Sequence, residues 1–88
     1  MRTVHIFVSG VVQGVGFRYF TKYTALSLGV KGWVRNLSDG RVEIMASGSE
    51  DAIKKFIEKI KAGPVMAKVR SVSVEDVPNE EFNSFEII

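Results

Sequence analysis

The alternation of apolar and polar residues along the chain constrains its fold more than any other feature of the sequence. Val4, Ile6 and Val8 are separated by single residues, which predicts a strand with one buried face. In two longer stretches the apolar residues recur every three or four positions, which is the spacing of an amphipathic helix. These patterns predict helices at 17–28 and 50–62 and strands at 4–9, 30–36, 41–47, 69–77 and 85–88.

Capping and turn residues mark the ends of these elements. Gly29 can end the first helix in the left-handed conformation. Ser49 is a favourable N-cap for the second helix, and the Gly-Pro pair at 63–64 stops it. The Ser-Asp-Gly triplet at 38–40 favours a turn, so the strands on either side of it should form a hairpin.

The resulting order is β-α-β-β-α-β with a short terminal strand, the order of the split βαβ plan. The expected fold class is therefore α+β: a ferredoxin-like α/β sandwich with two helices on one face of a mostly antiparallel sheet. A chain of 88 residues has the size of one domain, so we expect a single domain over residues 1–88.

The composition excludes several kinds of site. The absence of cysteine rules out disulfides, thiolate metal ligands and cysteine nucleophiles. No apolar run approaches the roughly 18 residues that span a membrane, and the first ten residues are too polar for a signal peptide. We therefore expect a soluble, cytoplasmic protein without membrane contact. The net charge of +2 is compatible with an anionic small molecule and does not by itself indicate nucleic acid.

The stretch GVVQGVGFR, residues 10–18, lies between the first expected strand and the first expected helix. Its glycines allow positive φ and close approach to backbone N–H groups, and we expect its valines to anchor the loop to the core. The start of a helix presents free N–H groups and the positive end of the helix dipole. Arg18 would place a permanently charged guanidinium beside them, where its charge is unfavourable unless an anion balances it. The stretch therefore indicates an anion-binding loop.

The same stretch also has a purely structural interpretation. A tight turn followed by a surface arginine would require the same glycines without binding any anion. The loop also matches neither common phosphate signature: the Walker pattern requires Gly-Lys-Ser/Thr, and the dinucleotide fingerprint requires a glycine where Tyr19 stands.

A second motif, GWVRN at residues 32–36, ends a predicted strand just before the hairpin turn. Taken alone, Asn36 is more typical of a turn former than of a functional group. The only histidine, His5, lies in a strand pattern outside both motifs and favours a packed or solvent-facing role.

Taken together, GVVQGVGFR after the first strand, GWVRN at the end of the second and NLSDGRVEI through the hairpin give a specific resemblance. Over essentially its whole length the sequence resembles the acylphosphatase family. That family hydrolyses the anhydride of a carboxylic acid and phosphate, without metal or cofactor. In the family, the arginine of the first motif holds the phosphate and the asparagine of the second holds the attacking water. The resemblance therefore implies these roles for Arg18 and Asn36, and neither position departs from the family pattern.

The residues fit that chemistry. An acyl phosphate has a good leaving group, a carboxylate whose conjugate acid has a pKa of about 4 to 5, so no general acid is required. Positioning and charge stabilisation then supply most of the acceleration. We expect backbone N–H groups of Gln13, Gly14, Val15, Gly16 and Phe17 to bind the phosphoryl oxygens together with Arg18. We expect Asn36, which stays neutral, to position the water, with no metal ion or other cofactor.

Other functions remain open on the sequence alone. Ferredoxin-like sheets also build RNA-binding modules, but KGWVRNLS lacks the aromatic pattern that those modules require. A non-catalytic anion-binding domain would retain the loop for its fold, and a carbamoyl-phosphate-handling module would belong to a larger protein. The expected partners are thus a small-molecule acyl phosphate and inorganic phosphate or a similar anion, not nucleic acid, with the chain acting as a monomer.

Overall fold

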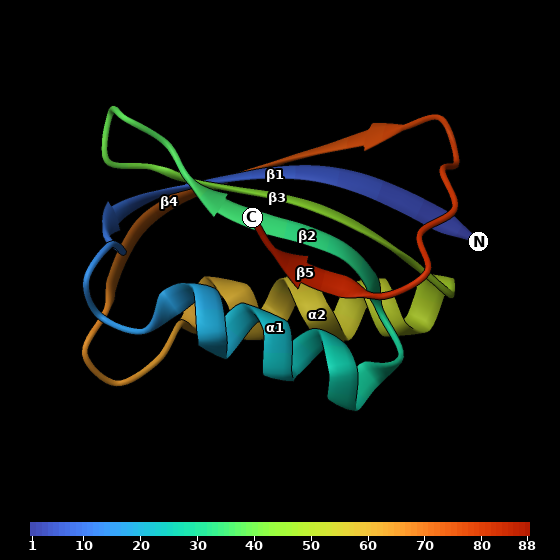
Figure 1. Ribbon diagram of the computed structural model, residues 1–88, viewed down its shortest axis with the longest axis horizontal. Coiled ribbons are helices and arrows are strands. Elements are labelled where there is room, and N and C mark those ends of the chain that lie inside the picture. The colour runs from blue at the N-terminus through green and yellow to red at the C-terminus, as the bar shows by residue number, and fades with distance from the viewer.

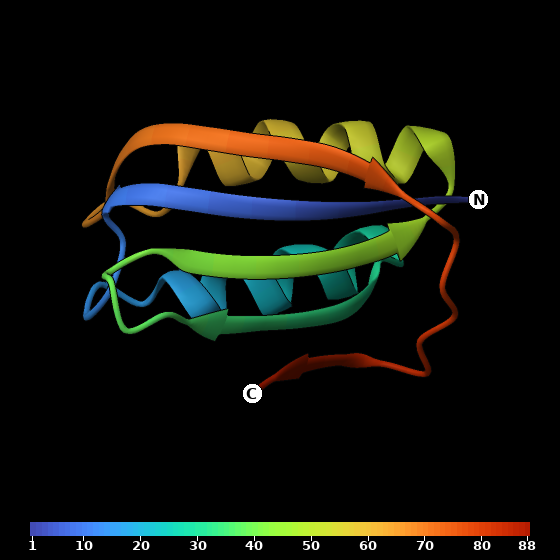
Figure 2. The same ribbon diagram turned by 90° about the horizontal axis from the view of Figure 1, so that it is seen from above.

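A computed structural model describes residues 1–88 as two helices packed on one face of a five-stranded sheet (Figures 1 and 2). The elements are β1 (Arg2–Val11), α1 (Phe17–Leu28), β2 (Lys31–Asn36), β3 (Val42–Gly48), α2 (Glu50–Ala62), β4 (Lys68–Val77) and β5 (Phe85–Ile87). The strand order across the sheet is β4-β1-β3-β2-β5. This confirms the expected α+β, ferredoxin-like architecture.

Strand pairing follows the hydrophobic alternation. β1 lies between β3 and β4 and is antiparallel to both, and β2 is antiparallel to β3. The short terminal strand is the exception, because β5 runs parallel to β2 at the edge of the sheet. Neither helix has the length and apolar character that a membrane-spanning helix requires.

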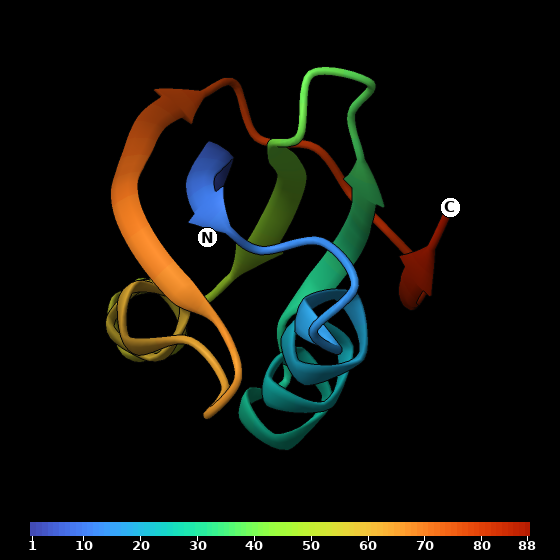
Figure 3. The ribbon, with the colours of Figure 1, turned by 90° about the vertical axis from the view of Figure 1, so that its left-hand side faces the viewer.

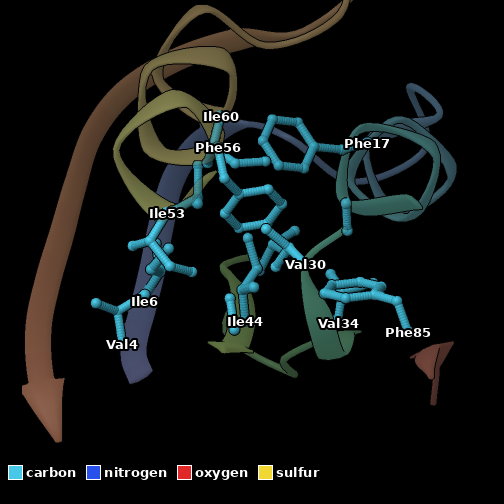
Figure 4. Close-up of a cluster of buried hydrophobic side chains, with 14 of the residues drawn as sticks. Val4, Ile6, Phe17, Val30, Val34, Ile44, Ile53, Phe56, Ile60 and Phe85 are labelled. Atoms are coloured by element: carbon cyan, nitrogen blue, oxygen red, sulfur yellow. The ribbon is translucent and has the colours of Figure 1, made fainter. Parts of the chain in front are cut away.

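The core lies between the sheet and the two helices (Figure 4). Alternate residues of β1, namely Val4, Ile6 and Val8, are fully buried, as their spacing predicts. From the helix layer, Phe56 packs against the ring of Phe85 with 6.1 Å between ring centroids. The full set of buried apolar side chains is Val4, Ile6, Val8, Val12, Phe17, Ala25, Val30, Val34, Val42, Ile44, Ala46, Ile53, Phe56, Ile60 and Phe85.

The buried face of α1 includes one polar residue. Its fully buried residues are Phe17, Thr21 and Ala25, whereas Phe20, Thr24 and Leu28 are half-buried. Apolar spacing alone does not indicate the buried position of the polar Thr21. Burial is possible because its hydroxyl donates a hydrogen bond to the Phe17 carbonyl oxygen, 2.8 Å away.

The helix ends are as expected. Gly29 ends α1 with a φ of 71°, in the left-handed region that favours glycine. The Ser49 hydroxyl caps α2 by accepting a hydrogen bond from the Ala52 N–H at 3.1 Å. Gly63 ends α2.

Three loops lie at one end of the molecule, which faces the viewer in Figure 3. They are the β1–α1 loop (residues 12–16), the β2–β3 loop (residues 37–41) and the α2–β4 loop (residues 63–67). This end holds both sequence motifs. Figures 1 and 2 show the same three loops at the left-hand end of the sheet.

Candidate active site

The β1–α1 loop is shaped by two glycines in the left-handed region. Gly14 has a φ of 74° and Gly16 a φ of 77°, and a Cβ added at either position would meet no atom within 4 Å. Glycine is therefore favoured here by backbone conformation and not by crowding. Gly16 is also the N-cap of α1 and supplies no side-chain acceptor. The first helical hydrogen bond runs from the Phe20 N–H to the Gly16 carbonyl, so the N–H groups before it are free of helical partners.

Apolar side chains fix this loop on the core. Val12 and Phe17 are fully buried, and Val15 is half-buried against the core. Val11 does not anchor the loop as expected, because it still belongs to β1 and its side chain is exposed. The backbone of the loop is thus held at both ends while its glycines face outward.

Arg18 is the second residue of α1 and is half-buried. Its guanidinium takes part in none of the six ion pairs of the chain, and the first turn of α1 contains no acidic residue. A positive charge near the N-terminus of a helix is unfavourable by roughly 0.3–1 kcal/mol when nothing neutralises it. The local charge of the loop therefore favours an anionic ligand.

Asn36 is the last residue of β2, on the same sheet face as Val34, which is buried against the helices. Its Oδ1 is buried and has no hydrogen-bond partner, and it is the only buried side-chain oxygen or nitrogen in that situation. An unpaired buried acceptor costs about 1–3 kcal/mol. Such an atom is suited to accept a hydrogen bond from a bound water or ligand.

The Gln13 side chain joins the two motifs. Its Nε2 donates to the carbonyl oxygens of Leu37, at 2.8 Å, and Arg41, at 2.9 Å. These two carbonyls lie at the two ends of the β2–β3 loop, which begins directly after Asn36. The amide therefore holds the β1–α1 loop against the strand end that carries Asn36. Sequence reasoning considered only the backbone of Gln13 and missed this contact, because both partners are distant in the chain.

The β2–β3 loop carries one carboxylate, and that carboxylate is locally neutralised. Asp39 accepts hydrogen bonds from the Arg41 backbone N–H at 3.1 Å and from its Nε at 2.9 Å. The backbone hydrogen bond, followed by the side-chain one, lowers the pKa of Asp39 below its usual value. The Arg41 guanidinium also lies 4.7 Å from the ring centroid of Phe7. The loop thus adds little net negative charge next to the anion-binding end.

A separate charged cluster lies on the sheet face away from the helices. Glu43 is paired with His5 Nε2 at 2.7 Å and with Arg35 Nε at 2.6 Å, and the Arg35 guanidinium lies over the Trp33 ring. His5 is therefore bound to a carboxylate outside both motifs. No group of three or more His, Cys, Asp or Glu side chains is placed to hold a metal ion.

Comparison with known proteins relates this arrangement to a family. The family model described as Acylphosphatase matches residues 4–87, a range that includes both motifs. The chain belongs to the acylphosphatase family. An acylphosphatase of Archaeoglobus fulgidus is 52% identical over 87 residues, covering 99% of this chain and 98% of the relative.

Solved structures of the family have the same fold. The crystal structure of acylphosphatase from Bacillus subtilis superimposes with a TM-score of 0.97 at 44% identity, covering 100% of this chain and 99% of that one. Full-length HypF, solved in a phosphate- and nucleotide-bound form, contains a segment that is 35% identical with a TM-score of 0.92. The match covers 99% of this chain and 12% of HypF. The acylphosphatase fold thus occurs in proteins of very different length.

Proposed function

We propose that the chain hydrolyses acyl phosphates by direct attack of water on phosphorus. Membership of the acylphosphatase family makes it a hydrolase of acyl phosphates. In the proposed mechanism the N–H groups of residues 13–17 and the Arg18 guanidinium bind the phosphoryl oxygens. Asn36 binds the attacking water.

The observation that carries this proposal is the unpaired, buried Oδ1 of Asn36. The Gln13 side chain ties the β1–α1 loop (residues 12–16, called the glycine loop below) to the loop that follows Asn36 through two hydrogen bonds. A water that donates a hydrogen bond to Asn36 Oδ1 would therefore lie beside an anion held by the glycine loop. This arrangement supports one site in which water and phosphate meet.

The proposed reaction needs no protein acid or nucleophile. The water oxygen forms a bond to phosphorus while the bond from phosphorus to the carboxylate oxygen breaks, and the electron pair leaves with the carboxylate. A proton of the water passes to a phosphoryl oxygen, giving inorganic phosphate. Arg18 and the backbone N–H groups stabilise the charge that develops on the equatorial oxygens.

Both motifs of the site come from a single chain, so we propose that residues 1–88 act as one domain and as a monomer. The ligands in this proposal are an acyl phosphate and its product, inorganic phosphate. Neither motif offers a carboxylate for a hard cation, so the proposed reaction uses no metal ion. The cytoplasmic location stays a prediction.

A hydrolysis assay on benzoyl phosphate with excess chelator tests this proposal. We expect turnover that is unchanged by the chelator and inhibited competitively by inorganic phosphate. Activity that returns only when a divalent cation is restored would contradict the mechanism. Phosphate binding without any hydrolysis would instead favour a non-catalytic anion-binding domain.

A further inference from the structure

Two large apolar side chains are exposed at the end of the molecule that carries the site. Val65 is 98% exposed and Met66 is 74% exposed. Both lie in the α2–β4 loop, within a tight turn in which the Ala67 N–H donates to the Pro64 carbonyl oxygen at 3.0 Å. Ala67 itself packs against the core. The turn is thus anchored while its two bulkiest apolar side chains face solvent.

This turn lies beside the glycine loop. β4 begins at Lys68, which pairs with Val11 at the end of β1, so the two loops leave the sheet from adjacent positions. At the other end of the turn, a Cβ added to Gly63 would lie 3.4 Å from the Phe17 ring. Figure 3 shows both loops side by side at the same end of the molecule, and Figure 1 agrees.

The sheet order places the turn opposite Asn36. Asn36 ends β2, whereas the turn leads into β4, and β1 and β3 separate these two strands. The glycine loop leaves β1 and therefore lies between them. In a phosphoryl transfer the attacking and leaving oxygens are roughly in line. A water held at Asn36 would thus direct the leaving carboxylate, with its acyl group, toward the α2–β4 loop.

From this geometry we propose that Val65 and Met66 form an apolar rim that contacts the acyl group of the substrate. The preferred substrates are then acyl phosphates whose acyl group is apolar, either aromatic or branched aliphatic. This inference rests on the proposed function, because it takes the phosphate position from the glycine loop and the water position from Asn36. The rim would favour apolar substrates by burying part of the acyl group, while the phosphate contacts stay the same for every substrate.

The test compares two substrates that share the phosphate and differ in the acyl group, benzoyl phosphate and acetyl phosphate. The variant is Val65→Gln with Met66→Gln in the full chain. One methylene in a closed pocket changes kcat/KM by about 10- to 200-fold, so an open rim of two side chains should reach the lower end of that range. We expect kcat/KM for benzoyl phosphate to fall about tenfold, mainly through KM. The value for acetyl phosphate and the inhibition constant of inorganic phosphate should change by less than about twofold.

Leu26→Gln is the matched control, because Leu26 is 55% exposed in the second half of α1, away from the three loops. This control should leave the preference for benzoyl phosphate unchanged. If the double variant lost kcat/KM equally for both substrates, or for neither, the proposed contact of Val65 and Met66 with the acyl group would be wrong, while the proposed hydrolase function would stand. If the unaltered chain turned over neither substrate, both the proposed function and this contact would be wrong.

Discussion

Arg18 has an unusual electrostatic setting for a half-buried arginine. It lies in the first turn of α1, without an acidic neighbour in that turn and without an ion pair. In folded proteins such a charge is ordinarily compensated. We propose that the phosphoryl group of the substrate neutralises the charge of Arg18. The planar guanidinium can donate two parallel hydrogen bonds to this group, which an ammonium cannot do.

Replacement of Arg18 should therefore affect catalysis more than stability. We expect Arg18→Ala to lower kcat/KM for benzoyl phosphate by about 10³-fold or more, as for other arginines that stabilise phosphoryl transfer. Arg18→Lys should be nearly as damaging, because an ammonium cannot make the bidentate contact. Thermal denaturation should show a melting temperature that is unchanged or slightly higher. Near-normal turnover in the alanine variant would remove Arg18 from the mechanism.

Asn36 allows water positioning to be separated from phosphate binding. Asn36→Ala should lower kcat by about 10²- to 10³-fold, the effect of losing one well-placed hydrogen-bonding group in a transition state. Inorganic phosphate should still inhibit with nearly the same constant. Stability should hold or rise by about 1 kcal/mol, because the substitution removes a buried unpaired oxygen. If phosphate affinity fell as far as kcat, the division of roles between Asn36 and the glycine loop would be wrong.

At the scale of the elements, the side chain of Gln13 holds the two motifs in position relative to each other. The Gln13 amide donates to Leu37 and Arg41 and so fixes the start of α1 relative to the end of β2. Both carbonyls keep a second partner within their own loop, in hydrogen bonds from the N–H groups of Gly40 and Leu37. Loss of the amide should therefore loosen the contact between the loops without unfolding either one.

Gln13→Met tests this role, because methionine has nearly the same length and no donor. We expect the free energy of unfolding to fall by about 1–2 kcal/mol, for two lost hydrogen bonds. Turnover should fall about 10- to 100-fold because Asn36 loses its fixed position relative to the phosphate. The inhibition constant of phosphate should change little, since the N–H groups of the glycine loop remain. Unchanged kcat in a stably folded Gln13→Met variant would mean that the contact is structural only.

Local patterns predicted the elements well. The bounds of α1 match the expectation, since Phe17 and Ala25 keep helical spacing and Gly29 supplies the left-handed end. The parallel pairing of β5 with β2 depends on the path of residues 78–84, which carry the chain from β4 at one edge of the sheet to β5 at the other. Hydrophobic periodicity does not specify that path. Thr21 can be buried because its hydroxyl donates a hydrogen bond within its own helix. A polar residue type therefore did not indicate that this position faces the core. In the candidate site, the motifs indicated Arg18 and Asn36, but the Gln13 contact arises only when distant loops meet.

At the scale of the whole molecule, the sheet face without helices carries a cluster of paired charged side chains. Glu43, on the central strand β3, is largely buried between His5 of β1 and Arg35 of β2. Burial raises the pKa of Glu43, but the hydrogen bonds from His5 and Arg35 and their charges outweigh it, so the pKa lies below its usual value. The cluster thus links three neighbouring strands.

The stability of the fold should consequently depend on pH through Glu43. A carboxyl group whose pKa is lower in the folded than in the unfolded protein raises the free energy of unfolding. That stabilisation is complete above the unfolded pKa of about 4.3, and it is lost as the pH falls through the folded pKa. Urea denaturation from pH 7 to pH 3 should show a steeper loss of stability at the acidic end for the unaltered chain than for Glu43→Gln. At pH 7 the variant should be less stable by about 1–3 kcal/mol. Identical pH dependence of the two proteins would contradict this role for Glu43.

Catalysis, in contrast, should not require this cluster. His5 lies outside both motifs and is bound to Glu43, so His5→Ala should keep most of the turnover of the unaltered chain. Its pH–rate profile should match that of the unaltered chain between pH 5 and 8, the range in which an essential histidine would titrate. A step present in the unaltered chain and absent from His5→Ala would show that the imidazole takes part in the reaction.

In the proposed mechanism, water held at Asn36 attacks the phosphorus of a bound acyl phosphate. A single turnover of benzoyl phosphate by excess protein in ¹⁸O-labelled water, with chelator present, tests it most directly, with mass spectrometry of both products. We predict one labelled oxygen in inorganic phosphate and none in benzoate, because the bond between phosphorus and the carboxylate oxygen is the one that breaks. Label in benzoate would mean attack at the acyl carbon and would contradict the proposed site.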